Sequence, residues 1–166
     1  MVVRAKRAGK VTKVDAEKLA RGEPVFTDDI VRPGMLYAKV LRSPHAHARI
    51  KNVDASKALE LDGVVDVIWH PDVKAIPHTR AGQSYPEPSP YDTVVLPKKA
   101  RFIGDRVAVV AAENLAAAER ALDLIEVDYK VLPAVVDMEA AMQEDAPVIH
   151  DEADTEGIYD RERNIV

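Results

Sequence analysis

The sequence contains no cysteine among its 166 residues. The chain therefore cannot form a disulfide-stabilised scaffold, supply a thiol nucleophile, bind an iron–sulfur cluster through its own thiolates, or hold zinc through cysteine. A domain of this length buries enough surface to fold without such cross-links. The absence of cysteine also fits a reducing compartment, and we expect a cytoplasmic protein.

Long apolar runs are absent as well. No stretch reaches the roughly 18 residues that a membrane-spanning helix requires, and the basic N-terminus is not followed by the apolar segment of a secretory signal. The net charge is −5, whereas nucleic-acid-binding domains are more often basic. The sequence thus predicts neither a membrane nor a nucleic-acid partner.

The common nucleotide-binding and hydrolase motifs are also missing. No G-x-G-x-x-G or G-x-x-x-x-G-K-[ST] motif follows an expected strand, and no G-x-S-x-G motif is present. The sequence therefore contains no motif for binding a dinucleotide or a nucleotide, and none for a serine hydrolase.

Charge and proline are unevenly distributed along the chain. Residues 1–21 contain seven Lys and Arg residues and two acidic ones, and we predict an extended basic arm over residues 1–24. A single domain is expected over residues 25–150, with a long proline-rich loop at 71–97. Residues 151–166 are expected to form an acidic linker toward downstream domains missing from this sequence. Little packing is expected after Glu144, except at residues 148–149.

Periodicity and capping residues predict an α+β fold, in which a mixed β-sheet carries a few short helices. Asp54, Asn114 and Asp137 are expected to cap helices, because their side chains can accept hydrogen bonds from the free amides of a first turn. The pattern strand, strand, short helix, strand over residues 35–69 is echoed over residues 101–131. The expected strands cover residues 25–26, 35–42, 46–53, 64–69, 101–103, 105–112 and 126–131, the expected helices cover 55–61, 115–125 and 138–143, and a single turn is expected at 71–73.

The expected core surrounds strand 105–112 and the helix that follows it. The strand is apolar along most of its length, which predicts a central position, with Val107 and Val109 facing the core. The helix is expected to bury one apolar stripe, formed by Leu115, Ala118, Leu122 and Ile125.

A few side chains could support chemistry. His45 and His47 lie two residues apart, so on a strand they share one face and could chelate a metal ion if a third ligand opposed them; the alternative is a structural or interface role. Asp28 and Asp29 could act as paired carboxylates in acid–base chemistry, or cap a strand end and face water. Ser43 precedes His45, but no motif supplies an acid to orient that pair for nucleophilic catalysis.

The proline-rich loop contains Tyr85, Glu87 and Tyr91. Tyrosine gives a large contact area at low entropic cost, so the two tyrosines either contact a partner or hold the loop against its own domain. We predict that residues 77–93 are mobile in the isolated domain and become ordered against a partner, because the prolines deny this segment a hydrogen-bonded ladder.

Several blocks taken together resemble one protein family. The most specific are RSPHAHARI (42–50) and GDRVAVVAAE (104–113), with L-P-A (132–134) following, and the blocks VDAEKLARGEPVFTDDI (14–30) and APVIHDEAD (146–154) extend the match. The chain resembles the N-terminal α/β hammerhead domain of the molybdenum-containing large subunit of the xanthine dehydrogenase and aldehyde oxidase family, which includes the aerobic carbon monoxide dehydrogenases. The loop sequence QSYPEPSPYDT is most similar to xanthine dehydrogenase-like members.

The resemblance implies a parent enzyme that hydroxylates purines, aldehydes or N-heterocycles with water as the oxygen source. Molybdopterin and the catalytic residues lie in later domains of the family, and iron–sulfur clusters and FAD on other domains or subunits. No catalytic, cofactor-binding or metal-binding residue is therefore predicted in this chain. Its expected partners are the downstream molybdopterin-binding domains and the iron–sulfur and flavin subunits. The alternatives are a free-standing protein-binding module that uses loop 71–97, or a small metalloenzyme built on His45 and His47.

Overall fold

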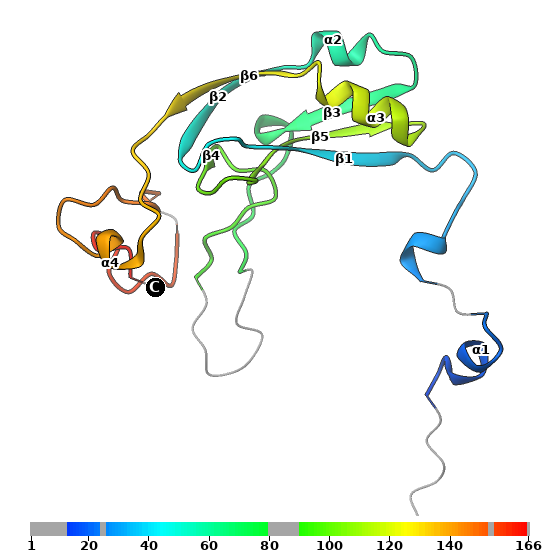
Figure 1. The fold of residues 1–166 in the computed structure, drawn as a ribbon, viewed down its shortest axis with the longest axis horizontal. Helices are drawn as coiled ribbons and strands as arrows, with labels where there is room; N and C mark the ends of the chain where they lie inside the picture. Colours follow the sequence, from blue (N-terminus) through cyan, green and yellow to red (C-terminus); the bar gives the residue numbers. More distant parts are fainter. Residues whose placement is uncertain (1–12, 24–25, 80–89, 153–154, 166) are drawn as a thin grey trace, which may run out of the picture. The chain divides into compact units, whose positions relative to one another are not determined.

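The computed structural model describes residues 13–23, 26–79, 90–152 and 155–165 (Figure 1). The chain divides into two compact units, residues 1–35 and residues 36–166. The described strands all lie in the second unit, whereas the described part of the first unit contains two short helices.

The first unit contains α1 (Ala16–Ala20) and the short 3-10 helix η1 (Thr27–Asp29). α1 lies inside the segment that was expected to be extended. Phe26, which was expected in a strand, instead precedes η1, and its backbone N–H donates to the Asp29 carboxylate at 2.9 Å. The expectation of a strand at Phe26 is wrong because this local side-chain contact stabilises a tight turn.

The second unit contains two three-stranded sheets, in the orders β1-β5-β3 and β4-β2-β6. All strand pairings among the described residues are antiparallel. The α+β class is confirmed, and the expected mixed sheet is resolved into these two antiparallel sheets. The elements are β1 (Tyr37–Arg42), β2 (Ala48–Asp54), α2 (Ser56–Leu59), β3 (Val64–Trp69), the 3-10 helix η2 (His70–Asp72), β4 (Lys99–Ala100), β5 (Arg106–Ala112), α3 (Leu115–Leu122), β6 (Glu126–Val131) and α4 (Met138–Ala141).

The echo in the sequence corresponds to two β-α-β connections that run between the sheets in opposite directions. The first, β2-α2-β3, leaves the sheet of β2 and enters the sheet of β5. The second, β5-α3-β6, makes the return crossing. Because β3 pairs with β5 and β2 pairs with β6, each sheet receives a strand from both connections, and the two sheets are held together.

Two of the three predicted helix caps, Asn114 and Asp137, are confirmed, whereas Ala55 occupies the cap position of α2 instead of Asp54. Asn114 accepts a hydrogen bond from the Ala117 N–H at 2.8 Å, and Asp137 accepts one from the Ala140 N–H at 2.8 Å. Asp54 accepts from the Ser56 N–H at 2.9 Å, one residue before the formal cap of α2. All three helices end earlier than expected, and turns follow them.

The core is centred on α3 and the central strand β5, and six of its twelve buried residues, among those that the structure describes, are alanine. Ala108, Val110 and Ala112 of β5 are fully buried, and so are the alanines of α3 that belong to the same cluster. Small side chains let the helix approach the sheet closely. Those helix residues are Ala117, Ala118 and Ala121.

Two details of the predicted core need correction. Val107 is fully buried as predicted, but Val109 is only partly buried and lies outside the core cluster. Side chains alternate along β5 from Ala108 to Ala112, which places Val110 toward α3 and Val109 on the opposite face. Val107 lies at the register shift opposite Leu41 and Arg42, where this alternation is interrupted. On α3, Leu115 is 44% exposed, because the buried stripe is rotated toward the alanines.

The strand expected at 101–103 is also displaced. β4 covers Lys99–Ala100, and a turn follows it in which Gly104 has a φ of +92°, a conformation that favours glycine. The carboxylate of Asp105, which is 2% exposed, accepts hydrogen bonds from the backbone N–H groups of Arg101 (3.1 Å) and Arg106 (2.9 Å). The buried carboxylate therefore fixes a turn where strand propensity alone predicted extension.

Candidate functional site

Ser43, His45 and His47 contact different parts of the chain and have different structural roles. The Ser43 hydroxyl donates to the backbone carbonyl of His45 at 3.0 Å and accepts from its N–H at 3.1 Å. This serine therefore stabilises a turn through the backbone of His45 and is not paired with its imidazole. The His45 ring packs edge-on against Tyr129 of β6, with ring centroids 4.9 Å apart. His47 is buried, with Nδ1 2.6 Å from the carbonyl oxygen of Pro133. Both histidines thus attach the start of β2 to β6 and the segment after it.

This geometry supports the structural reading of the histidine pair. Each ring has its own neighbour, and in the part of the chain that the structure describes no three His, Asp or Glu side chains lie close enough together to hold a metal ion. Asp29 is engaged in capping η1, and the side chain of Asp28 lies outside the described residues.

The base of the proline-rich loop is held by backbone hydrogen bonds. His78 and Thr93 form an antiparallel bridge with bonds of 2.8 and 3.2 Å. Tyr91, which is 50% exposed, donates its N–H to the carbonyl oxygen of Glu156 at 2.9 Å. Tyr85 and Glu87 lie outside the described residues, as does most of the segment predicted to be mobile. The loop base therefore connects to the C-terminal segment as well as to itself.

A cluster of charged side chains joins the C-terminal segment to the sheet of β2 and β4, and we refer to it as the charged cluster. Lys99 is 1% exposed, and its ammonium contacts Asp151 and lies 3.6 Å from Glu152. Arg101 pairs with Glu152 at 2.5 Å, and Arg49 pairs with Asp151 at 2.7 Å. The expectation of little packing after Glu144 is therefore wrong, because the buried Lys99, together with the more exposed Arg49 and Arg101, fixes two acidic residues of this segment.

The electrostatics of the charged cluster favour ionised carboxylates. Burial opposes ionisation of Asp151, but the hydrogen bond and charge of Lys99 outweigh it and hold the pKa of Asp151 below its ordinary value. Burial likewise opposes ionisation of Glu152, and the charges of Arg101 and Lys99 hold its pKa below the ordinary value. His150, 3.6 Å from Asp92, has a lowered pKa, caused first by burial and then by the charge of Arg101.

A second set of bonds closes the C-terminal segment on itself. The Arg161 guanidinium donates to the carbonyl oxygens of His150 (2.7 Å), Glu152 and Thr155 (3.0 Å). Asn164 accepts from the Ile149 N–H at 2.8 Å. Sequence reasoning missed this arrangement, because neither an arginine nor an asparagine in an acidic segment indicates by itself which carbonyl oxygens it will contact.

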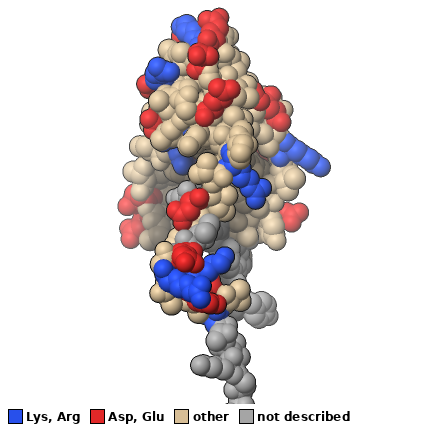
Figure 2. Space-filling view, turned by 90° about the vertical axis from the view of Figure 1, so that its right-hand side faces the viewer, with Lys and Arg blue, Asp and Glu red and all other residues tan. Residues whose placement is uncertain are grey.

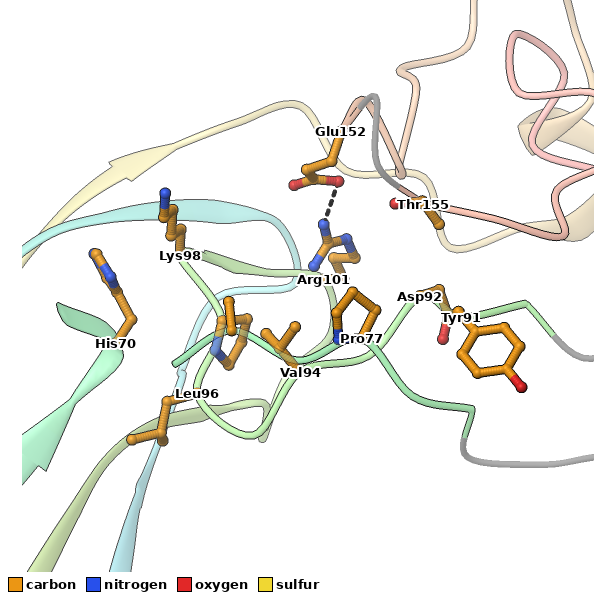
Figure 3. A pocket seen from close by; sticks show the side chains of 12 residues that line it. His70, Pro77, Tyr91, Asp92, Val94, Leu96, Lys98, Arg101, Glu152 and Thr155 are labelled. Carbon is orange, nitrogen blue, oxygen red and sulfur yellow. Dashed lines mark ion pairs between the residues drawn. The ribbon is translucent and has the colours of Figure 1, made fainter. Parts of the chain in front are cut away.

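Beside the charged cluster lies a cavity of about 180 Å³ (Figure 3). The Arg101–Glu152 pair forms one wall, and most of the remaining lining is apolar, including Pro77, Val94 and Leu96. Ligand pockets usually measure about 300–1,000 Å³, so this cavity suits a single side chain rather than a cofactor. It is too small for a molybdopterin, and the residues around it do not fit that group.

One face of the molecule, shown in Figure 2, has no concentration of charge of one sign among the described residues. On the face shown in Figure 2, Lys and Arg side chains of the described residues are interspersed with Asp and Glu, with uncharged surface between them. Among the described helices, none is long and apolar enough to cross a bilayer.

Comparison with known proteins identifies the fold. The family described as "Aldehyde oxidase and xanthine dehydrogenase, a/b hammerhead domain" matches residues 21–133. The chain is 51% identical over 140 residues to the "Probable hypoxanthine oxidase XdhD" of Escherichia coli O157:H7, covering 84% of this chain and 15% of that protein. It is 37% identical over 147 residues to the carbon monoxide dehydrogenase large chain of Afipia carboxidovorans, covering 86% of this chain and 17% of that protein.

Solved structures to which this chain is similar belong to the same broad kind of enzyme as the relatives found by sequence. The Cu,Mo-CO dehydrogenase matches with a TM-score of 0.70 and 38% identity, over 86% of this chain and 18% of that chain. Quinoline 2-oxidoreductase from Pseudomonas putida 86 matches with a TM-score of 0.66 and 36% identity, over 82% of this chain and 18% of that chain. The chain therefore spans less than a fifth of these relatives, and it belongs to the aldehyde oxidase and xanthine dehydrogenase family, of whose large subunits it forms the α/β hammerhead domain.

Proposed function

We propose that this chain serves as a structural module of a molybdenum-dependent hydroxylase and performs no chemistry by itself. One observation carries the proposal: the chain matches the hammerhead domain over residues 21–133 but spans only 15–18% of the length of its relatives. The roles of the described side chains support it. Ser43, His47 and Asp29, which sequence reasoning considered for chemistry, are each engaged in turns, caps or strand contacts.

We propose further that the whole protein hydroxylates a heterocycle or an aldehyde, with purines favoured. The support is the 51% identity to a probable hypoxanthine oxidase, together with 36% identity to the "Xanthine dehydrogenase molybdenum-binding subunit" of Escherichia coli O157:H7. Molybdopterin, which supplies the redox centre in such an enzyme, is expected on polypeptide outside this chain. Iron–sulfur and flavin subunits are the expected further partners, and the cytoplasm is the expected location.

A hybrid subunit tests the proposal. The segment of Escherichia coli XdhD that matches this chain is replaced by the chain, and a second XdhD lacks the segment altogether. We expect the hybrid to be soluble, to contain molybdenum and to oxidise hypoxanthine, and the deleted subunit to lose these properties because it lacks a packed domain. A deleted subunit as active as the intact one, or a folded hybrid without molybdenum, would overturn the proposal.

The second candidate function is a free-standing protein-binding module. The observation that favours it is the half-exposed Tyr91 beside a cavity that fits one side chain. If the deleted XdhD keeps its activity, this candidate gains support, because the domain would then be dispensable for the enzyme.

A further inference from the structure

We propose that the face of the β1-β5-β3 sheet opposite α3 docks against the part of the large subunit that lies outside this chain. We refer to this face as the open face. This inference rests on the proposed function and names the surface by which the module is attached. Its residues are Ala38, Val40, Ile68, Val109 and Ala111.

Strand register places these residues together. Ala38 is paired with Ala111, and Val40 with Val109, across β1 and β5. Ile68 of β3 is paired with Val109 on the other side. Paired residues of neighbouring strands point to the same face of a sheet, so the five side chains form one continuous apolar surface over three strands.

The opposite face of the sheet is the one that is filled. Lys39, paired with Val110, points toward α3 and forms an ion pair with Glu119 of that helix at 2.9 Å. α2 and α3 contribute to the buried core on that side. None of the open-face residues belongs to the core, and each is partly buried or exposed. The helix layer therefore covers one face of the sheet, as Figure 1 shows for α3.

The composition of the open face is that of a buried surface. Antiparallel sheets with one solvated face normally alternate apolar and polar residues, whereas strands covered on both faces are apolar throughout. From Val107 to Ala112, β5 contains only valine and alanine. Asp66 of β3 is exposed and is paired with Ala111, so it adds one carboxylate at the β3 edge of the open face, and the exposed Arg42 lies at the end of β1. An apolar centre with a polar rim is the arrangement of a protein interface.

The extent of the relatives identifies the occupant. This chain spans 15–19% of three relatives that it matches, so more than four fifths of such a protein remains to cover the face. A second copy of this chain is a poorer fit, because a stable dimer usually buries about 800 Å² on each partner, more than five small side chains provide. A surface on the same polypeptide needs less area, because attachment within one chain makes its local concentration high. Because valine, isoleucine and alanine make up most of the open face, with Asp66 at its β3 edge, it selects a largely apolar surface on that polypeptide.

The test places lysine on the open face of the hybrid XdhD subunit and of the isolated chain. The variants are Val40→Lys and Val109→Lys, and the matched control is Val131→Lys, a 60% exposed valine on β6 of the other sheet. In the isolated chain we expect all three variants to unfold at a temperature close to that of the wild type. In the hybrid we expect the two open-face variants to lose most of their molybdenum and soluble subunit, and the control to keep both.

A labelling experiment covers the case in which a lysine variant fails to fold. Because the chain has no cysteine, Ala111→Cys introduces a single thiol, whose modification by a maleimide is followed by mass spectrometry of its peptide. We expect labelling at least tenfold slower in the hybrid than in the isolated chain. Equal rates in both would overturn the inference.

The outcomes separate this inference from the proposed function. A wild-type hybrid that does not assemble counts against the proposed function. A wild-type hybrid that assembles, with open-face variants that assemble equally well, overturns the docking surface alone. A concentration-dependent dimer of the isolated chain that Val109→Lys dissociates would assign the face to a second copy and also overturn the inference.

Discussion

The alanine-rich layer between α3 and β5 and the charged cluster around Lys99 hold the second unit together in different ways. The first layer joins elements that are adjacent in sequence, and its contacts are apolar and non-directional. The charged cluster joins residues 49, 99–101 and 151–152, which are far apart in sequence, through paired charges. Apolar packing tolerates small shifts, whereas a buried charge requires its specific partner.

The largest effect is expected from a substitution in the alanine-rich layer between α3 and β5. Val110→Asp places a carboxylate in the filled face and should destabilise the chain by on the order of 4 kcal/mol, enough to prevent folding of many domains. Val109→Asp, one residue away on the open face, should cost about 1 kcal/mol and leave a cooperative unfolding transition. Thermal and urea unfolding of the two variants measure the difference, and equal losses would contradict the assignment of the two faces.

The charged cluster should respond more to the loss of an acid than to the loss of its lysine. Asp151→Asn leaves the Lys99 ammonium buried with Glu152 at 3.6 Å as the remaining acidic partner, and should cost about 3 kcal/mol. Lys99→Met removes the buried charge itself and leaves carboxylates that are about one-third exposed, so its cost should be smaller, about 1 kcal/mol. Urea unfolding compares the two, and the reverse order would contradict this description.

Acid should weaken the charged cluster before it affects the alanine layer. The pKa values of Asp151 and Glu152 are lowered in the folded chain, so their contribution is complete above their ordinary values of 3.8 and 4.5 and is lost as the pH falls through the lower folded values. His150 has a lowered pKa as well, so protonation disfavours the folded chain once the pH falls below its ordinary value of 6.5.

The destabilisation caused by protonation of His150 is followed by tryptic cleavage in the segment that holds Arg161. Cleavage is measured from pH 7 to the lowest pH at which trypsin remains active. Urea unfolding from pH 7 to about pH 3 follows the carboxylates. We expect the double variant Asp151→Asn, Glu152→Gln to show a flatter dependence below about pH 5. Identical profiles for the double variant and the wild type would rule out the two carboxylates as the source of the acid sensitivity.

The smallest expected effect concerns the cap of α3. Asn114→Ala removes the acceptor for the Ala117 N–H and should cost about 1 kcal/mol, whereas Asn114→Asp keeps an acceptor and should cost less. Urea unfolding resolves this difference. If the alanine variant were as stable as the wild type, the cap would contribute nothing to the packing of α3.

Local features could be predicted from the sequence. Strand alternation located β1, β2, β3, β5 and β6, and the side chains of Asp54, Asn114 and Asp137 located the helix starts, because each depends on residues close together in the chain. The charged cluster could not be predicted in this way. Nothing near Asp151 indicates Lys99 as its partner, and an acidic segment is by itself typical of a solvated linker.

The corrections have the same origin. Val109 and Val110 are both valines on one strand, and the position of α3 decides which of them is buried. The strand expected at 101–103 became a turn because the buried Asp105 carboxylate bonds two nearby backbone amides, and because the backbone of Gly104 and Asp105 is hydrogen-bonded to Ser43, far away in sequence. In both cases tertiary contacts override local propensity. The absence of a catalytic motif and the family resemblance were both readable from the residues, and the match over residues 21–133 confirms the resemblance.

The central claim is that this chain is a folded module without chemistry of its own, and one measurement on the purified 166-residue chain tests it most directly. The chain is expressed in cells that make molybdopterin, its molybdenum content is measured by mass spectrometry, and oxidation of hypoxanthine and of an aldehyde is assayed with an artificial electron acceptor. We predict cooperative thermal unfolding, no bound molybdenum and no turnover above buffer. Stoichiometric molybdenum, or turnover by the chain alone, would contradict the claim.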